Sequence, residues 1–405
     1  MGIYLDYQAT TPLAPEALAA MLPWLEHQHA NPHSAHAEGR KARAAVEAAR
    51  ATIMSRFEAP EHAPSDSEQL EDATKRMFDR IDAELARRRS LAGPGAGRLF
   101  FTSGATEALN WAIRGTWLRR ARGRHRVVTV ATEHACVLDS VEALAGEGAE
   151  VVILPVDRQG LIDGDAASAA IDDRTAMVVA MLVNNEIGVR QHIGWLGRLA
   201  REAGATMICD AVQGFLRARL PTEDCDLIAI SAHKLYGPKG VGALWVREGH
   251  DPAPILHGGR QEGSRSGTLS PALCVGFAAA VAGFGSFDAE HIEKLWQVAR
   301  ETLRGPDWVL NGDRVCRYHG NLNVRLPGLD VARLMSELRD IAFSAGSACA
   351  SGSGRPSHVL KAIGLSDAEA RSSIRLGFGR YTTEAELREA VRRIDAAARA
   401  QRVAA

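Results

Sequence analysis

The sequence predicts an α/β fold with a large domain on a mainly parallel sheet and a smaller α/β domain near the C-terminus. Short apolar runs alternate with helical patterns through the first two thirds of the chain, the order of a parallel sheet covered on both faces. From Pro271 the pattern changes to long helices and a smaller mixed region. The length of 405 residues exceeds the roughly 250 to 300 at which one core stops growing, which favours two domains.

Short apolar runs predict the strands of the large domain. Between most of them lie Ala- and Leu-rich segments with helical spacing, such as Ala105 to Arg119 and Ile193 to Ala203. Ligands of such sheets bind beyond the carboxyl ends of the strands, so the residues after each strand are the first candidates for a site. The predicted strands are Leu99–Thr102, Val127–Ala131, Val151–Leu154, Met177–Val183, Met207–Asp210, Leu227–Ser231 and Gly242–Val246.

The C-terminal third predicts the second domain. We expect a large domain at residues 12–258 and a small domain from residues 1–11 and 259–405, because the N-terminal segment is expected to join the two. The predicted elements of the small domain are the helices Pro271–Phe284, Ala289–Leu303 and Glu384–Ala400 and strands near Leu322–Leu326 and Ser373–Phe378.

One segment of the large domain predicts an additional helix. Ser65 to Glu68 has the Ser-x-x-Glu form of a capping box, and apolar residues from Leu70 to Leu85 follow at helical spacing. We therefore expect an amphipathic helix at about residues 65–90, within a helical insertion at about residues 60–97.

Composition and charge are those of an ordinary globular protein. Hydrophobic residues make up 46% and charged residues 24%, and the net charge is -1, so the sequence predicts neither nucleic-acid nor anionic-membrane binding. The longest nearly apolar stretches, Thr175 to Val183 and Ala272 to Phe284, are shorter than the roughly 20 residues that cross a bilayer. The start of the chain has no basic segment or long apolar core, so no secretory signal is predicted.

The cysteines predict a reducing, cytoplasmic setting. They show neither C-x-x-C pairing nor the density of a disulfide scaffold. Most of them lie among apolar neighbours, as Cys209 does, and are expected to be buried core thiols. No metal site is predicted. The six positions are Cys136, Cys209, Cys225, Cys274, Cys316 and Cys349.

Lysine is scarce, and Lys234 is the lysine best placed to meet a ligand. It follows the predicted strand Leu227–Ser231, in a turn made irregular by Gly237 and Pro238. A loop lysine is, by itself, more often simply solvated. The lysines on helical patterns with charged or exposed neighbours are Lys41, Lys75, Lys294 and Lys361.

The segment Phe101 to Glu107 joins a predicted strand to a predicted helix. Its small residues, with Ala105 and Thr106 at the helix start, let backbone N–H groups approach a phosphate. Ser231 and His233 can add donors at the neighbouring strand end. The same small residues also suit any tight strand-to-helix turn, so the pattern alone is weak.

Three further strand ends carry polar groups. Asp210 ends a buried strand, with Gln213 three residues later; a buried carboxylate needs a partner, which a protonated pyridine nitrogen supplies, although a helix cap is the simpler explanation. His134 follows another strand, where an imidazole can stack on a planar ring or have a structural role. Asn185 lies in the polar segment 183–188 after a fourth strand.

Taken together, these strand ends supply an amine, a partner for a ring nitrogen, a stacking ring and a phosphate cradle, all of which pyridoxal 5'-phosphate (PLP) requires. Their order along the chain resembles the fold-type I PLP enzymes, whose best-known member is aspartate aminotransferase. Within that superfamily the chain most resembles the class-V cysteine desulfurases of iron–sulfur cluster assembly, over nearly its whole length. The matching segments are Tyr4–Pro12, Asn31–Ser34, Val183–Val189, His233–Gly242, Arg265–Leu269 and Ser372–Arg375.

The resemblance implies a role for each group around the cofactor ring. Lys234 would carry PLP covalently and move the substrate proton, and His134 would stack on the ring. Asp210 would pair with the ring nitrogen, and Gln213 would reach the ring oxygen.

The resemblance also implies the groups at the two ends of the site. Ala105, Thr106, Ser231 and His233 would hold the phosphate, and Thr268 would reach it from a second subunit, which implies a homodimer. Asn31, Asn185 and Arg375 are the expected substrate-binding residues, with Asn185 also against the cofactor.

Cys349 is the expected sulfur acceptor. Small residues surround it from Phe343 to Gly354, so the sequence alone equally allows a redundant exposed cysteine. The family places its nucleophile in such a Ser-Ala-Cys loop, which implies that Cys349 takes sulfur from L-cysteine as a persulfide, leaving alanine. An acceptor protein, such as an iron–sulfur scaffold, would then receive the sulfur.

Some features depart from the family pattern. Ala232 replaces a usual glycine, which is tolerated if its φ is negative, and the chain looks one residue shorter around residues 258–263. Two alternatives stay open: another fold-type I PLP enzyme, such as a selenocysteine lyase or aminotransferase, and an inactive sulfur-trafficking scaffold. Cys349 argues against an aminotransferase, and the retained set of site residues argues against a scaffold.

Overall fold

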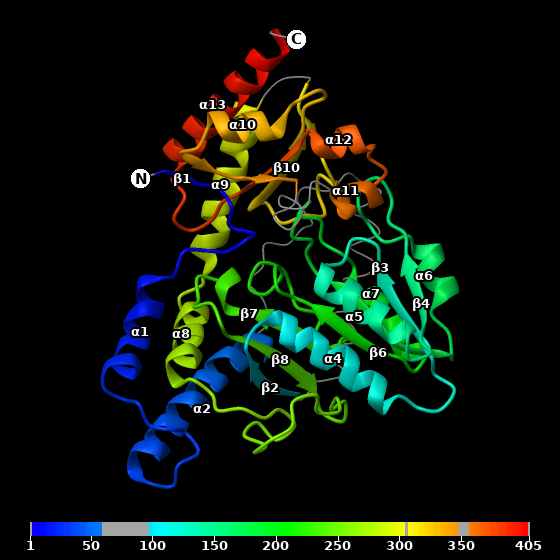
Figure 1. Cartoon of the computed structure of the whole chain (residues 1–405), viewed down its shortest axis with the longest axis vertical. Coiled ribbons are helices and arrows are strands. Elements are labelled where there is room, and N and C mark those ends of the chain that lie inside the picture. Colours follow the sequence, from blue (N-terminus) through cyan, green and yellow to red (C-terminus); the bar gives the residue numbers. More distant parts are fainter. Residues whose placement is uncertain (1, 59–96, 304–306, 347–355, 404–405) are drawn as a thin grey trace.

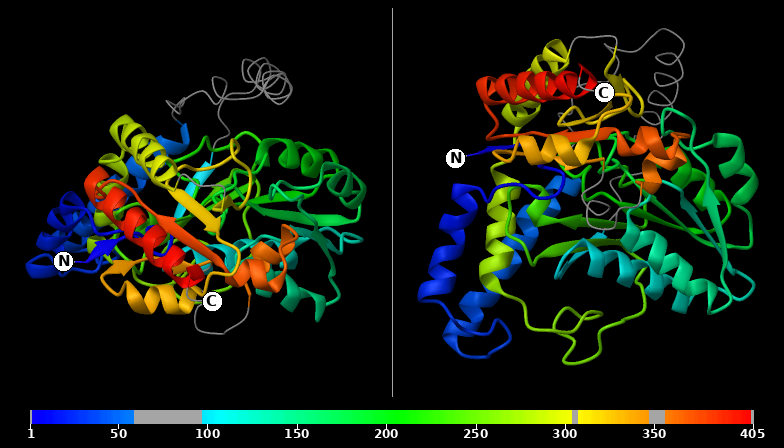
Figure 2. Two further views of the ribbon diagram at one scale, coloured as in Figure 1. Left: turned by 90° about the horizontal axis from the view of Figure 1, so that it is seen from above. Right: turned by 45° about the horizontal axis from the view of Figure 1, so that its top comes forward.

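A computed structural model describes residues 2–58, 97–303, 307–346 and 356–403. Figure 1 shows a large lower part around an extended sheet and a smaller upper part that contains the last helix. Figure 2 shows the first residues of the chain beside this upper part, close to C-terminal segments. The predicted helix at about residues 65–90 lies outside the described residues.

The large part is built on a seven-stranded sheet with strand order β2-β8-β7-β6-β5-β3-β4. Strand β8 is antiparallel to both β2 and β7, and the other neighbours are parallel, so β2 points the same way as the parallel strands. The sheet is therefore mainly parallel, as predicted. Its strands are β2 (Gly97–Thr102), β3 (Arg126–Val130), β4 (Glu150–Leu154), β5 (Thr175–Met181), β6 (Thr206–Asp210), β7 (Leu227–Ser231) and β8 (Gly242–Arg247).

Helices cover both faces of this sheet, which is why its central strands are apolar along their whole length. In β3, Val128 and Val130 face a cluster shared with α2, α7 and α8, whereas Val127 faces a cluster shared with α4 and α5. Figure 1 shows α4 and α5 across the near face. The helices of this part are α1 (Pro15–Glu26), α2 (Ala37–Glu58), α4 (Ala105–Arg119), α5 (Ala135–Ala145), α6 (Gly164–Ala170), α7 (Ile193–Glu202) and α8 (Pro271–Ala282).

The smaller part has a core of its own between a four-stranded sheet and the C-terminal helices. The first strand of the chain joins it, because Ile3 and Tyr4 pair in parallel with Ile341 and Ala342. Residues at opposite ends of the chain therefore share one core. Its elements are β1 (Ile3–Tyr4), α9 (Ser286–Thr302), β9 (Val309–Leu310), β10 (Asn321–Arg325), α10 (Val331–Glu337), β11 (Ile341–Ala342), β12 (Ser344–Ala345), α11 (His358–Ala362), α12 (Asp367–Arg371), β13 (Ser373–Gly377) and α13 (Glu384–Val403).

Helices α8 and α9 connect the two parts and meet at a bend of 69°. Among the described residues, no single helix is long and apolar enough to cross a membrane. Within the described ranges, one bent pair, α8 with α9, reaches the length and composition of a span when the two helices are taken together. Much of α8 is buried in the core of the large part.

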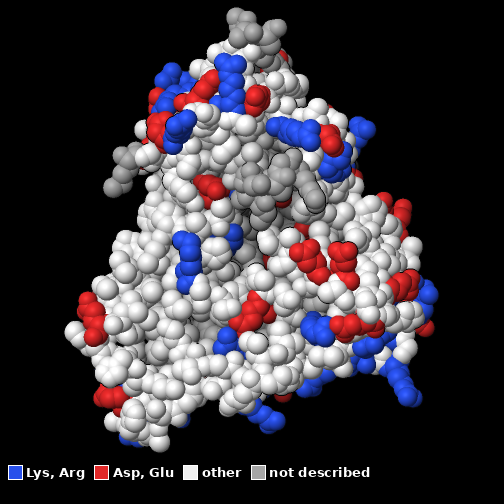
Figure 3. All heavy atoms as spheres, in the orientation of Figure 1, with Lys and Arg blue, Asp and Glu red and all other residues white. Residues whose placement is uncertain are grey.

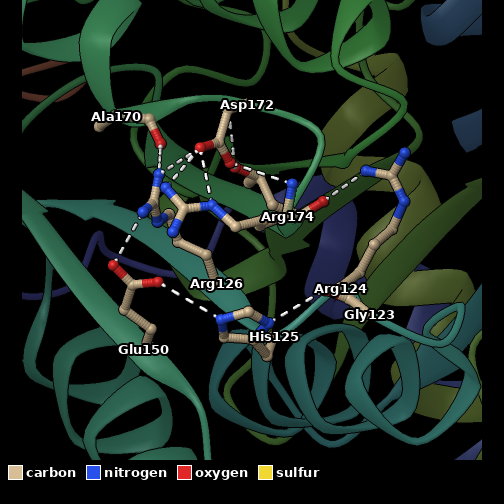
Figure 4. Close-up of polar contacts among 9 residues, drawn as sticks. Gly123, Arg124, His125, Arg126, Glu150, Ala170, Asp172 and Arg174 are labelled. Carbon is tan, nitrogen blue, oxygen red and sulfur yellow. Dashed lines mark hydrogen bonds and ion pairs between the residues drawn. The ribbon is translucent and has the colours of Figure 1, made fainter.

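An ion-pair network closes the amino edge of the parallel strands (Figure 4). Arg126, at the start of β3, is 7% exposed and bonds Glu150 at 2.8 Å and Asp172 at 2.9 Å. Asp172 also pairs with Arg174 at 2.7 Å. These ion pairs occupy this edge with structural contacts, although the buried Nε of Arg126 has no partner among the described residues.

Candidate active site

The opposite, carboxyl edge of the sheet gathers most of the predicted site residues. Strands β3, β6 and β7 end beside His134, Asp210 and Ser231. Strand β2 ends at this edge too, because Thr102 and Ser231 both pair with Gly242 of the reversed strand β8. Local sequence patterns thus converge in space because the strands share a direction.

Lys234 ends a short 3-10 helix, η2 (Ala232–Lys234), that follows β7. Its Nζ donates to the carbonyl oxygens of Gln8 at 2.6 Å and Ala9 at 2.8 Å. Burial, followed by the charges of Arg375 and Arg217, lowers the pKa of Lys234 to about 8, against the opposing effect of nearby acids. A neutral amine, the form that attacks an aldehyde, is therefore accessible near neutral pH.

The turn after Lys234 depends on an unusual backbone. Tyr236 has a φ of 63°, and a Cβ on Gly237 would lie 2.9 Å from both the Cβ and the carbonyl oxygen of Ala232. Glycine at position 237 is required by this close approach. Ala232 itself does not have positive φ, which agrees with the expectation that alanine is tolerated there.

Asp210 and His134 lie within electrostatic range of Lys234. Burial raises the pKa of Asp210, even though one carboxylate oxygen accepts the Val212 N–H at 2.9 Å. Burial lowers the pKa of His134, whose Nδ1 accepts the N–H of Cys136 at 3.1 Å. A buried carboxylate beside an uncharged imidazole suits a cationic partner such as a protonated ring nitrogen.

The turn between β2 and α4 is open around Gly104, because a Cβ at that position would meet no atom within 4 Å. Gly104 caps α4 without a side-chain hydrogen bond, so the N–H groups of Ala105 and Thr106 begin the helix without a capping side chain. A Cβ on Gly242 would lie 2.8 Å from the Cα of Gly104 and 2.7 Å from a carbonyl oxygen of β7. Ser231 is 2% exposed at the adjacent strand end. Gly242 thus allows the turn and β7 to come together.

His233 faces the N-terminal segment from the same 3-10 turn. Its Nδ1 lies 3.2 Å from the hydroxyl of Thr10. Burial and the charge of Lys234 lower the pKa of His233 to about 4, so the ring is neutral at pH 7 and can donate one hydrogen bond.

Arg375 is an inward-facing arginine on β13, 1% exposed. Its guanidinium donates to Asp6 at 2.7 Å, to the Ser344 hydroxyl at 3.0 Å and to the carbonyl oxygen of Asn185 at 3.0 Å. Its buried Nε has no partner among the described residues. A planar guanidinium with an unused N–H donor suits a substrate carboxylate. Asn185 contacts Arg375 through its backbone carbonyl oxygen.

Gln213 is 4% exposed and held on both sides of its amide. Its Nε2 donates to the Gln8 carbonyl at 2.9 Å, and its Oε1 accepts from Arg217 at 2.8 Å. Sequence reasoning missed Arg217 and Asp6. Neither belongs to a local pattern that predicts contact with the site, although Asp6 lies in a segment that matches the family.

Asn31 and Thr268 lie on the surface of this chain. Asn31 is exposed, and its Oδ1 accepts the His33 N–H at 2.9 Å within its own turn. Thr268 is exposed in the loop between β8 and α8. An ion pair of 2.8 Å between Arg265 and Glu107 ties this loop to the first turn of α4. Cys349 lies outside the described residues.

These groups fit PLP in each of its parts. One edge of the sheet carries the amine of Lys234, whose pKa is lowered, and the buried carboxyl group of Asp210. The same edge carries the imidazole of His134 and the start of α4, which has no capping side chain. The positions that would hold PLP are those of Lys234, Asp210, His134, Thr106 and Ser231; bound there, PLP supplies an electron sink for carbanion chemistry. Figure 3 shows acidic and basic side chains interspersed on the face in view, rather than a field of one sign.

The chain belongs to the class-V aminotransferase family. The family model matches residues 3–63 and 72–389, which is most of the sequence. Enzymes of this family depend on PLP, so the predictions of a fold-type I enzyme and of its cofactor are confirmed.

Within the family, the chain is similar to proteins named cysteine desulfurase IscS. That of Rickettsia bellii is 39% identical over 405 residues, covering 97% of this chain and 90% of its own length. That of Rickettsia typhi is 38% identical over 402 residues, covering 96% and 90%.

Solved structures share the whole fold. A structure titled NifS-like protein has a TM-score of 0.82 and 27% identity, covering 98% of this chain and 99% of its own. A structure titled SspA in complex with cysteine has a TM-score of 0.76 and 32% identity, covering 94% of this chain and all of its own.

Proposed function

We propose that the chain is a PLP-dependent cysteine desulfurase that converts L-cysteine to L-alanine and carries the sulfur as a persulfide on Cys349. The observation that carries the proposal is the meeting of Lys234, of lowered pKa, with Asp210 and with Arg375 at one site. Relatives named cysteine desulfurase support the substrate, as does the related structure with cysteine.

The residues divide the work by their chemistry. Arg375 binds the substrate carboxylate, with Asn31 and Asn185 as further substrate-binding residues, and Lys234 in its neutral form removes the α-proton. Sulfur transfer forms a sulfur–sulfur bond to Cys349 and breaks the Cβ–S bond of the substrate. The carbon skeleton takes up a proton and leaves as alanine, so cysteine and thiol become alanine and persulfide.

The cofactor contacts are proposed residue by residue. His134 stacks on the ring, Asp210 pairs with its nitrogen and Gln213 donates to its oxygen. The positions proposed to hold the phosphate are Ala105, Thr106, Ser231, His233 and, from a second subunit, Thr268.

A homodimer with shared sites follows from the proposed role of Thr268. The exposure of Thr268 and the ion pair between Arg265 and Glu107 support this role, because the loop is fixed while its tip faces outward. The proposed assignment of residues 1–11 to the small domain is supported by the pairing of β1 with β11. Helix α8, which lies within the proposed range 259–405, packs instead in the core of the large part.

The proposed setting is the cytoplasm, where an acceptor protein such as an iron–sulfur scaffold takes the sulfur. The thiols of Cys136, Cys209, Cys225 and Cys274 are not paired in disulfides, which supports a reducing compartment. The acceptor is identified by its chemistry: it needs a reactive thiol that can attack a persulfide.

The test is mass spectrometry after treatment with L-cysteine. One added sulfur is expected on the peptide that contains Cys349, and Cys349→Ser should retain PLP while alanine production falls to background. Cys274→Ala is the matched control, because burial raises the pKa of the Cys274 thiol to about 12 and it should not take part. Undiminished turnover in Cys349→Ser would favour an aminotransferase.

A further inference from the structure

Arg217 lies seven residues beyond Asp210, in the turns between β6 and β7. The residue before it, Leu216, has a φ of 61°, a left-handed conformation that is strained for a residue other than glycine. The strained turn aims the guanidinium at the site, where it lies 4.9 Å from the centroid of the Tyr318 ring. Because the strain persists, other contacts must stabilise this orientation.

Those contacts form a closed ring of hydrogen bonds. Arg217 donates from one nitrogen to the carbonyl oxygen of Lys234 and from the other to Oε1 of Gln213 at 2.8 Å. Nε2 of Gln213 donates to the Gln8 carbonyl at 2.9 Å, which also accepts Nζ of Lys234 at 2.6 Å. The backbone and the amine of Lys234 are therefore tied into the same ring.

The ring fixes which way the Gln213 amide points. Arg217 can only donate, so it requires Oε1 on its side, and the Gln8 carbonyl can only accept, so it requires the NH₂ group on the other. One N–H of that NH₂ group bonds Gln8, which leaves the second to donate elsewhere. Without Arg217 this orientation would depend on the Gln8 carbonyl alone, so the amide would be held by one hydrogen bond of this ring instead of two.

The positive charge of Arg217 also acts on Lys234, in addition to these hydrogen bonds. The charged groups that act on Lys234 are Arg375 and Arg217, which lower its pKa, and Asp210 and Asp6, which raise it. Lys234 in turn acts on the neighbouring rings of His134 and His233. Removing Arg217 would leave one cation, Arg375, and two carboxyl groups, Asp210 and Asp6, among these charged groups.

We propose that Arg217 is a positioning residue that orients the Gln213 amide as a hydrogen-bond donor toward the cofactor and fixes the backbone of Lys234 against it. This inference rests on the proposed roles of Lys234 and Gln213. It extends these proposed roles, because it assigns the orientation of Lys234 and Gln213 to Arg217. In this role Arg217 contacts neither substrate nor cofactor.

A double-mutant cycle on cofactor-free protein tests this, with pyridoxal phosphate titrated and followed by absorbance. Arg217→Met should weaken pyridoxal phosphate binding by about tenfold, the usual effect of one net hydrogen bond. Adding it to Gln213→Leu should weaken binding further by less than about twofold, because both act through one amide. Arg219→Met is the matched control: Arg219 lies two residues after Arg217 but pairs with Glu223, four residues further along, so this variant should bind pyridoxal phosphate as the wild type does.

The pH dependence of cofactor capture is an independent measurement. Arg217→Met should raise the pH at which cofactor capture is half-maximal, the midpoint, by up to about one pH unit, because Lys234 loses a nearby positive charge. Arg217→Lys should keep the wild-type midpoint but still lose affinity, because one ammonium cannot replace the planar fork. Arg217→Lys also decides the question if Arg217→Met does not fold.

Two results would overturn the inference: additive effects of Arg217→Met and Gln213→Leu, or an unchanged midpoint and affinity in the Arg217 variants. Failure of the proposed function looks different. In that case borohydride would fix the cofactor of the wild-type protein to a peptide that lacks Lys234, whatever Arg217 does.

Discussion

Gly242→Ala should separate phosphate binding from every other contribution of the site. A Cβ at this position would lie 2.8 Å from the Cα and carbonyl carbon of Gly104, about 0.6 Å short of the 3.4 Å at which ordinary contact begins. It would also lie 2.7 Å from the carbonyl oxygen of Ile230. All of these are backbone atoms, so relief requires the turn and β7 to move apart.

The expected loss follows from that displacement. Overpacking of this kind costs about 1 to 3 kcal/mol of stability. Because a misplacement of about 1 Å can cost on the order of a hundredfold, a shift of about half that size should weaken pyridoxal phosphate binding by about tenfold or more. The affinity for pyridoxal, which has no phosphate, should change little.

The assay compares the affinities of pyridoxal phosphate and pyridoxal for cofactor-free protein, and the measured quantity is their ratio. Gly146→Ala is the control, because its φ is -63° and its Cβ would meet the Ala143 carbonyl oxygen at an ordinary 3.5 Å. If Gly242→Ala kept the wild-type preference for pyridoxal phosphate, the turn before α4 would not be the phosphate site.

Three further outcomes are expected. Since the pKa of Lys234 falls from 10.5 to about 8, this group binds more protons in the unfolded chain between these values, and it should add a rise with pH of about 3 kcal/mol to the free energy of unfolding of cofactor-free protein through this window, relative to a variant without the amine. Urea unfolding of Lys234→Met should lack that rise, and equal slopes in the two proteins would contradict the assignment. Mixing Lys234→Ala with Thr268→Ala chains should restore part of the activity, because one site of each heterodimer keeps both groups; a fully active monomer in sedimentation would refute shared sites. Arg126→Met should lower Tm by breaking contacts at the amino edge (Figure 4) while leaving pyridoxal phosphate affinity unchanged, and a matching loss of affinity would show that the two edges are coupled.

The sequence predicts the elements of the sheet well because buried strands need apolar residues throughout. Each of the predicted strands of the large part is present, and α4 has the predicted bounds, Ala105–Arg119. Differences are confined to the ends: the strand predicted at Met177–Val183 is β5, Thr175–Met181, and the helix predicted at Ala289–Leu303 is α9, Ser286–Thr302. Element ends depend on caps and neighbours, which periodicity does not report.

Lys234 was identifiable from sequence because lysines are few and this one follows a strand. Its lowered pKa was not, since Arg375 and Arg217, which lower it beyond burial, approach it only in the folded chain. The reversed direction of β8 was equally hidden, because an apolar run has no direction, yet this reversal places Gly242 against both Thr102 and Ser231.

The sequence by itself determined the fold class, the PLP chemistry and the candidate residues, because apolar periodicity, residue chemistry and order along the chain are local properties. Tertiary structure decided which of those residues meet. Asp6 reaches Arg375 across 369 positions, and Gln213 reaches the carbonyl of Gln8 across 205. Such contacts arise from strand direction and from the pairing of β1 with β11, and no local pattern encodes them, because side chains at these separations become neighbours only when the chain folds.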